Sequence, residues 1–285
     1  MGIYLNPEND EYKRAINSEI YVDKTELIAV TNRKLNTEHQ NICVSRPRRF
    51  GKSMAANMLV AYYCKNVDSR DIFSGFKIAN DETFEKHLNK YNVIHINMID
   101  FLSRADSVDD LIDYLQRRLL WDIKKEYSDV DCFDWNDLVD VLETVYSEKK
   151  LPFVIIIDEW DCIFRKYPDN VEEQKKYLDF LRFFLKGKSY VALAYMTGIL
   201  PIKKYGEHSA LNMFDEYSMT NQRELAEFTG FTEEEVKTLC VQYDMPYEKM
   251  KQWYDGFIFG KQKAPEAFRL QGRTFFAVPP CLSPA

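Results

Sequence analysis

The chain has 285 residues, of which 46% are hydrophobic and 29% are charged, and its formal net charge is −7. This length suits one large domain or a domain with an appendage, and the balance of apolar and charged residues is that of a globular protein with a sizeable core. The negative charge argues against a generally basic nucleic-acid-binding protein, and the six scattered cysteines form neither a zinc-binding spacing nor a dense disulfide framework.

The sequence shows neither a signal-peptide core nor an apolar run long enough to span a bilayer. We therefore expect no membrane association. The cysteine pattern favours a reducing cytoplasmic environment in which the thiols stay free.

Short apolar runs along the chain predict the strands of a buried sheet. The first is "NICVS" at 41–45, and it is followed by "YNVIHINMI" at 91–99, "FVIIIDEWD" at 153–161 and "SYVALAYMTG" at 189–198. The third run is continuous and β-branched, as expected of a strand that is buried on both faces.

Helical patterns lie between these runs. Apolar residues recur at helical spacing from Lys52 onward, and helices are predicted over 107–127, with Ser107 as the N-cap, over 134–148 and over 168–187. Strands that alternate with helices predict an α/β fold with a mostly parallel sheet that is covered on both sides.

The last part of the chain is more polar. After Thr220 it reads as helical, without a strand candidate. The expected organisation is an α/β domain over 1–220, a small helical appendage over 221–260 and an irregular tail over 261–285.

The segment "SRPRRFGKSM" at 45–54 joins the first predicted strand to a helix. Phosphate-binding loops follow the pattern G-x-x-x-x-G-K-[ST], and Gly51, Lys52 and Ser53 match its second half. Lys52 would reach the β- and γ-phosphates, and the hydroxyl of Ser53 would bind Mg²⁺. Arg46 stands where the pattern has its first glycine, so a basic turn that caps a helix is the alternative.

Two adjacent acids end the third apolar run. Asp158 would hold the Mg²⁺, and Glu159 would act as the general base for a water that attacks the γ-phosphate. Acids at the carboxyl end of a strand face the crevice in which open α/β sheets bind ligands. The alternative is that they cap the following turn. Thr197 ends the next strand and would sense the γ-phosphate or position the water.

With these parts in place, the sequence resembles the AAA-ATPase-like family, whose P-loop domain is often fused to a C-terminal PD-(D/E)XK-type nuclease domain. The likeness runs in order over about residues 10 to 260 and lies in these segments: "IYVDKTELI" (20–28), "SRPRRFGKS" (45–53), "IIIDEWD" (155–161), "MTGILPI" (196–202), "GFTEEEV" (230–236) and "WYDGF" (253–257). The resemblance implies a three-layer α/β/α P-loop NTPase fold that uses ATP and Mg²⁺.

The R-P-R-R-F-G-K-S form of the loop is itself similar to that family, although its Arg46 departs from the general motif. The expected nucleotide-binding set is Arg46, Arg48, Arg49, Phe50, Gly51, Lys52, Ser53 and Met54. Four residues match the family's N-terminal motif, where they would pack near the nucleotide base or cap a helix: Tyr21, Asp23, Lys24 and Thr25.

The resemblance stops near Gly260, and the following sequence looks like a truncated or frame-shifted end, so we expect the usual nuclease domain to be missing. The segment "PDNVEEQK" at 168–175 contains residue types that nucleases use, but the pattern places it at the start of a helix. We therefore do not expect nuclease chemistry in this chain.

The sequence predicts ATP binding with Mg²⁺-dependent hydrolysis. One alternative is a nucleotide-gated regulatory or interaction module with negligible turnover, and another is a small-molecule or nucleoside kinase, which the adjacent Asp-Glu disfavours. Arg165 and Arg182 are candidates for an arginine supplied to a neighbouring subunit. Homo-oligomerisation and a nucleic-acid target are left open.

Overall fold

The computed structural model describes residues 2–202, 211–219, 221, 223–249, 257–258 and 274–276. Most of the predicted tail over 261–285 therefore lies outside the described residues. Within the described part, no helix is both long and apolar enough to cross a membrane.

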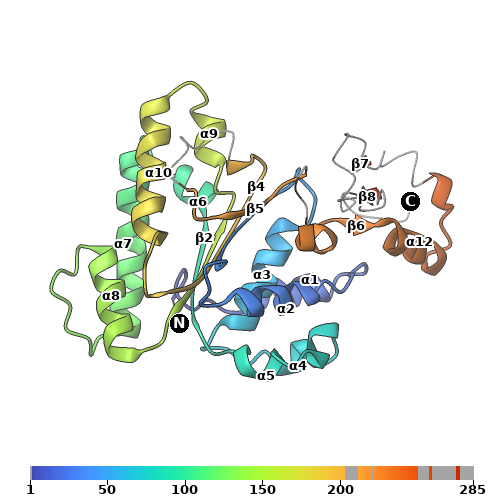
Figure 1. Cartoon of the computed structure of the whole chain (residues 1–285), viewed down its shortest axis with the longest axis horizontal. Coiled ribbons are helices and arrows are strands. Elements are labelled where there is room, and N and C mark those ends of the chain that lie inside the picture. Colours follow the sequence, from blue (N-terminus) through green and yellow to red (C-terminus); the bar gives the residue numbers. More distant parts are fainter. Residues whose placement is uncertain are drawn as a thin grey trace.

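Helices and strands alternate along most of the described chain (Figure 1). The helices are α1 (Asp10–Ile16), α2 (Glu26–Lys34), α3 (Lys52–Tyr63), α4 (Arg70–Phe73), α5 (Phe84–His87), α6 (Met98–Leu102), α7 (Val108–Glu126), α8 (Leu138–Lys149), α9 (Cys162–Lys166), α10 (Val171–Leu185) and α12 (Glu233–Gln242), with the 3-10 helices η1 (Lys77–Asn80) and η2 (Arg223–Phe228). The strands are β1 (Asn41–Ser45), β2 (Asn92–Asn97), β3 (Phe153–Asp158), β4 (Val191–Gly198), β5 (Asp215–Tyr217), β6 (Phe231–Thr232), β7 (Phe257–Ile258) and β8 (Thr274–Phe276).

The main sheet is five-stranded, in the order β2-β3-β4-β1-β5, and each neighbouring pair is parallel. In the register, Ile157 of β3 lies opposite Met196 of β4, and Val44 of β1 lies opposite Thr197. The order places β4 between β1 and β3, so the segments that follow β1 and β3 leave the sheet at the same edge.

Side chains of the sheet alternate between two cores. Ile155 and Ile157 of β3 pack with α7, α8 and α10, whereas Val154 and Ile156 pack with α2 and α3 on the opposite face. Figure 1 shows the same arrangement, with α7, α8 and α10 on one side of the strands and α1, α2 and α3 on the other. The predicted three-layer α/β/α fold with a mostly parallel sheet is therefore confirmed.

The predicted strands and helices of this domain are confirmed, with boundaries that shift by a few residues. The cap of α7 is also as expected, because the Ser107 side chain accepts a hydrogen bond from the amide of Asp110. The segment 168–175 opens α10, whose N-cap is Asn170, instead of forming the facing strands that a nuclease site needs. This placement agrees with the expectation of a helix start.

The expectation that no strand follows Thr220 was wrong. A second, antiparallel sheet has the order β6-β8-β7, and it lies in the C-terminal part of the described chain. Its strands are only two or three residues long, so they are too short to produce a period-2 pattern that a sequence reading could detect.

Gly198, the last residue of β4, lies against the indole of Trp160. A Cβ at this position would come within 2.6 Å of the Trp160 ring and 2.7 Å of Asp161 Oδ1. Because Trp160 is completely buried, it cannot move aside without disturbing the core. We expect Gly198→Ala to lower the free energy of unfolding by about 1–3 kcal/mol.

Urea unfolding of the purified variant measures this effect. Gly75→Ala is a suitable control, because a Cβ added there would meet no atom within 4 Å. If both alanine variants unfold at the same urea concentration as the original chain, the close packing of Trp160 on β4 is contradicted.

Candidate functional site

The loop between β1 and α3 ends at a left-handed glycine. Gly51 has a φ of 71°, a region that glycine adopts without steric cost, and it is the N-cap of α3. The first turn of α3 contains no acidic residue, and within the described residues no side-chain cap forms at its amides. The free amides and the helix dipole therefore leave a partial positive charge at this end, which suits an anion.

Lys52, the first residue of α3, folds back over the loop. Lys52 is only 5% exposed, and its Nζ donates a hydrogen bond to the carbonyl oxygen of Pro47 at 3.1 Å. Burial lowers the pKa of Lys52, whereas the nearby carboxylates of Glu159, Asp158 and Asp161 act in the opposite direction. The lysine thus lies in the electrostatic field of the acids that follow β3, about a hundred residues later in the sequence.

Asp158 is held between two strands. Its Oδ1 accepts a hydrogen bond from the amide of Glu159 at 2.9 Å and a second one from the hydroxyl of Thr197 on β4. Both Asp158 and Thr197 are buried. Among the described residues, Oδ2 of Asp158 makes no hydrogen bond, so one carboxylate oxygen remains available as a ligand atom.

Glu159 points to a different partner. Its carboxylate forms an ion pair with the guanidinium of Arg165 on α9, and Arg165 Nε also lies 3.4 Å from Asp161 Oδ2. Glu159 has a φ of 55°, which is unusual for a residue other than glycine. Arg165 is one of the two candidates, with Arg182, for an arginine supplied to a neighbouring subunit, and in this structure its guanidinium contacts acids of its own chain.

Asp161 is a buried residue of the site to which the sequence reading assigned no role. It is fully buried, and its Oδ2 accepts a hydrogen bond from the amide of Leu200 at 3.1 Å. The signal that was present is the third acid of "IIIDEWD", two residues after Glu159.

The other loop residues have different surroundings. Arg48, Arg49 and Ser53 are exposed, and Met54 is half-buried. Phe50 is buried, and its carbonyl oxygen accepts a hydrogen bond from the amide of Gly230 at 2.8 Å. Arg46 is also buried and donates to main-chain carbonyls.

A mainly apolar pocket lies directly beside the loop. It is lined by segments from three parts of the chain: Tyr12, Ile20, Tyr21, Val22, Lys24, Phe50, Gly51, Met54, Ala55, Met58, Phe228, Gly230 and Phe231. Two residues of the N-terminal motif line this pocket, and two others contact each other at the start of α2. Tyr21 and Lys24 line the pocket, whereas Asp23 accepts hydrogen bonds from the amide and hydroxyl of Thr25 at the start of α2.

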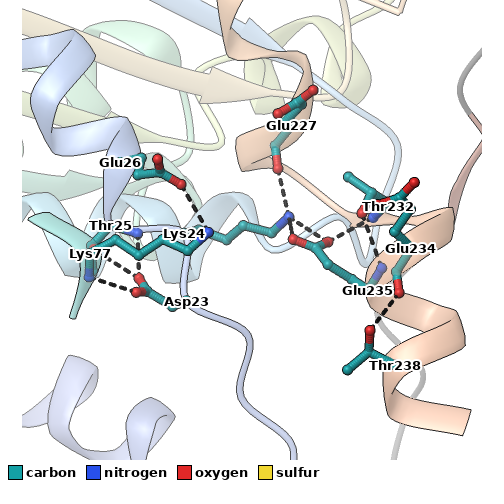
Figure 2. A network of polar contacts seen from close by, with 10 residues as sticks. All are labelled: Asp23, Lys24, Thr25, Glu26, Lys77, Glu227, Thr232, Glu234, Glu235 and Thr238. Atoms are coloured by element: carbon teal, nitrogen blue, oxygen red, sulfur yellow. Dashed lines mark hydrogen bonds and ion pairs between the residues drawn. The ribbon is translucent and has the colours of Figure 1, made fainter. Parts of the chain in front are cut away.

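Lys24 connects this pocket to the C-terminal part of the described chain (Figure 2). Its Nζ lies 2.6 Å from the Glu235 carboxylate and donates to the carbonyl oxygen of Glu227. The same carboxylate accepts from the amide of Thr232, and the Thr232 hydroxyl accepts from the amide of Glu235, which completes a capping box at the start of α12. Burial lowers the pKa of Lys24, and Glu235 opposes this effect.

We expect Lys24→Met to loosen α12. The side chains of Lys24 and Glu235 are only 14% and 24% exposed, so removal of the ammonium leaves a carboxylate that is largely desolvated. A loss of about 1–2 kcal/mol corresponds to a rise of about 5- to 30-fold in amide exchange over Glu233–Gln242.

Hydrogen exchange read by mass spectrometry measures this change, with the amides of α7 as an internal reference. Lys77→Met is the matched control, because its ion pair with Glu26 is 60% and 55% exposed and contributes little. Equal exchange of α12 in both variants would show that the Lys24–Glu235 contact does not hold the helix.

The chain matches a known protein family over most of its length. A family model described as a predicted AAA-ATPase matches residues 10–206. A search of curated proteins finds no significant match.

Two solved structures show a distant similarity. One is the Aeropyrum pernix ORC2 protein in its ADPNP–ADP complexes, with 10% identity and a TM-score of 0.39, over 80% of this chain and 55% of that chain. The other is Cdc6p from Pyrobaculum aerophilum, with 12% identity and a TM-score of 0.33, over 84% of this chain and 53% of that chain. The chain spans about half the length of these two structures.

The family match covers more than half of the 285 residues and includes β1, the loop, β3 and β4. The order of the parallel strands agrees with it, since the loop and the acids follow strands that are separated only by β4. The chain therefore belongs to the family of predicted AAA-ATPases and contains a P-loop NTPase domain.

Proposed function

We propose that this chain binds ATP and hydrolyses its γ-phosphate with Mg²⁺. The observation that carries the proposal is that Lys52 opens α3 after β1 and Asp158 ends β3, on parallel strands separated only by β4, so that both lie at the same edge of the sheet. A lysine, a helix N-terminus and two acids are the parts that phosphoryl transfer to water requires.

In this proposal, Lys52 and the amides near Gly51 bind the phosphates. The nucleotide-binding set also includes Arg48, Arg49, Phe50 and Met54, of which Phe50 and Met54 line the pocket beside the loop. The apolar wall of that pocket, with Tyr21, suits the base of the nucleotide.

The donor atoms fit Mg²⁺. This ion is usually held by one or two carboxylates together with substrate phosphates and waters, and Asp158 Oδ2 and the hydroxyl of Ser53 would supply the protein oxygens. Bound Mg²⁺ would neutralise charge on the phosphates during the reaction. The described residues contain no cluster of three or more metal-ligating side chains, so we infer that the ion enters together with the nucleotide.

The catalytic roles go to Glu159, Lys52 and Thr197. Glu159 would accept the proton of the attacking water, and Lys52 would stabilise charge on the γ-phosphate. The hydroxyl of Thr197 donates a hydrogen bond to Asp158, so Thr197 would orient this carboxylate as well as face the phosphate.

A second candidate is a nucleotide-gated regulatory module without significant turnover. The observation that favours it is the ion pair of Glu159 with Arg165, because a carboxylate held by a guanidinium is not oriented toward a water. In that case ATP binding would set a conformation, and the contacts of Phe50 and Lys24 with the segment 227–235 would transmit it.

Purified protein distinguishes the two functions. ATP binding is measured by calorimetry, and phosphate release is measured under the same conditions with excess Mg²⁺. Binding with release supports the ATPase, binding without release supports the regulatory module, and absence of binding contradicts both.

A further inference from the structure

Arg46, the residue in place of the first loop glycine, has an unusual environment for an arginine. It is only 2% exposed, and its Nη1 donates to the carbonyl oxygens of Ser45 at 3.0 Å and Tyr217 at 2.8 Å. Its Nη2 is buried without a hydrogen-bond partner among the described residues.

The charge of this guanidinium lacks a counter-ion. Within the described part of the chain, no carboxylate forms an ion pair with Arg46, and burial lowers its pKa to about 10. At neutral pH the group is still protonated, because this value lies well above 7. A buried charge without a partner is unfavourable, so an arginine at this position is costly unless an anion compensates it.

Arg46 also lies where the central strands end. Its amide donates to the carbonyl oxygen of Gly198 at 3.0 Å, next to Thr197, and its side chain reaches Tyr217, the last residue of β5. The residue therefore connects the ends of β4, β1 and β5 at the start of the loop. β5 itself pairs in parallel with β1, and the hydroxyl of Tyr217 donates to Glu224 at 3.1 Å.

We propose that Arg46 is a positioning residue whose buried positive charge is compensated by the bound phosphates, and that its hydrogen bond to Tyr217 makes the end of β5 part of the phosphate site. The inference rests on the proposed nucleotide site. It assigns to Arg46 a role behind the loop, different from that of the exposed Arg48 and Arg49.

Two variants separate charge from shape. Arg46→Gln removes the charge but keeps an amide that donates hydrogen bonds, and Arg46→Lys keeps the charge but lacks the planar fork. Affinities for pyrophosphate, ATP and adenosine are measured by calorimetry. Arg33→Gln is the control, because Arg33 lies on α2 and is 59% exposed.

We expect Arg46→Gln to lower the affinities for pyrophosphate and for ATP by the same factor, about tenfold or more, because a desolvated charge is lost. Arg46→Lys should stay within about threefold of the original chain for pyrophosphate, because it keeps the charge. Adenosine carries no phosphate, so its affinity should be the same in all variants. Arg33→Gln should change none of the three.

Hydrogen exchange tests the link to β5. Pyrophosphate should slow exchange in a peptide that covers Asp215–Tyr217 in the original chain but not in Arg46→Gln. The melting temperature of each free variant shows that it is folded, and Arg46→Lys provides the charge test if Arg46→Gln does not fold.

The outcomes are distinct. If the original chain binds neither ATP nor pyrophosphate, the proposed function itself fails. If it binds both and Arg46→Gln binds pyrophosphate equally well, only the role of Arg46 is wrong. Equal losses of pyrophosphate affinity in Arg46→Gln and Arg46→Lys would mean that Arg46 acts through its shape alone, which contradicts the proposal. Amide exchange in β5 that does not change when pyrophosphate binds would contradict it as well.

Discussion

Replacement of Lys52 by alanine is expected to weaken ATP binding by at least about 30-fold, which corresponds to about 2 kcal/mol or more. The ammonium is buried in the loop, so its contact with a phosphate would be made away from bulk water, where such contacts are strong. Among the residues that the structure describes, its one hydrogen bond is to Pro47, and this bond uses one of its three donors. The others are free to bind phosphate oxygens.

The control for Lys52→Ala is a lysine that is also largely buried but lies away from the loop. Lys188 is 17% exposed and forms an ion pair with Glu143, far along the chain from the loop. Lys188→Ala should leave the dissociation constant for ATP unchanged in calorimetry. If Lys52→Ala also leaves it unchanged while the protein remains folded, ATP does not bind at this loop.

The second large effect is expected for Glu159→Gln, which should lower the turnover of ATP and leave its binding intact. The amide keeps the shape of the side chain but cannot accept a proton from water. The rate constant kcat for phosphate release should fall by a factor of about 10²–10⁴, the usual contribution of a general base. The dissociation constant for ATP should change by less than about threefold, because the lost interaction belongs to the transition state.

Glu173→Gln is a matched control for this measurement. Glu173 is 15% exposed and pairs with Lys176, much as Glu159 is 17% exposed and pairs with Arg165. The control should keep kcat. An unchanged kcat in Glu159→Gln would remove the base assignment and leave the metal and phosphate residues standing.

The parts of the fold that the sequence predicts are those with a strong local signal. β1, β3 and β4 are buried on both faces, so they appear as continuous apolar runs. β5 was not predicted, because "DEY" is short and mostly acidic. It forms through parallel pairing with β1, which brings together residues about 170 positions apart in the sequence.

The site shows the same division. The candidate residues that a motif names, Lys52, Asp158 and Glu159, could be proposed from the sequence because phosphate chemistry fixes their types and their place after strands. The pairing of Glu159 with Arg165 depends on how α9 turns back, and the contact of Lys24 with Glu235 joins positions that are 211 residues apart. Such contacts arise only from tertiary packing, so no local pattern contains them.

The most direct test is a crystal structure of the chain with a non-hydrolysable ATP analogue and Mg²⁺. We predict that the phosphates lie at the N-terminus of α3 in contact with Lys52 Nζ, and that the metal ion contacts Ser53 and Asp158. Glu159 should then face the γ-phosphate. A triphosphate bound elsewhere, or a metal ion that Asp158 does not approach, would contradict the proposed ATPase site.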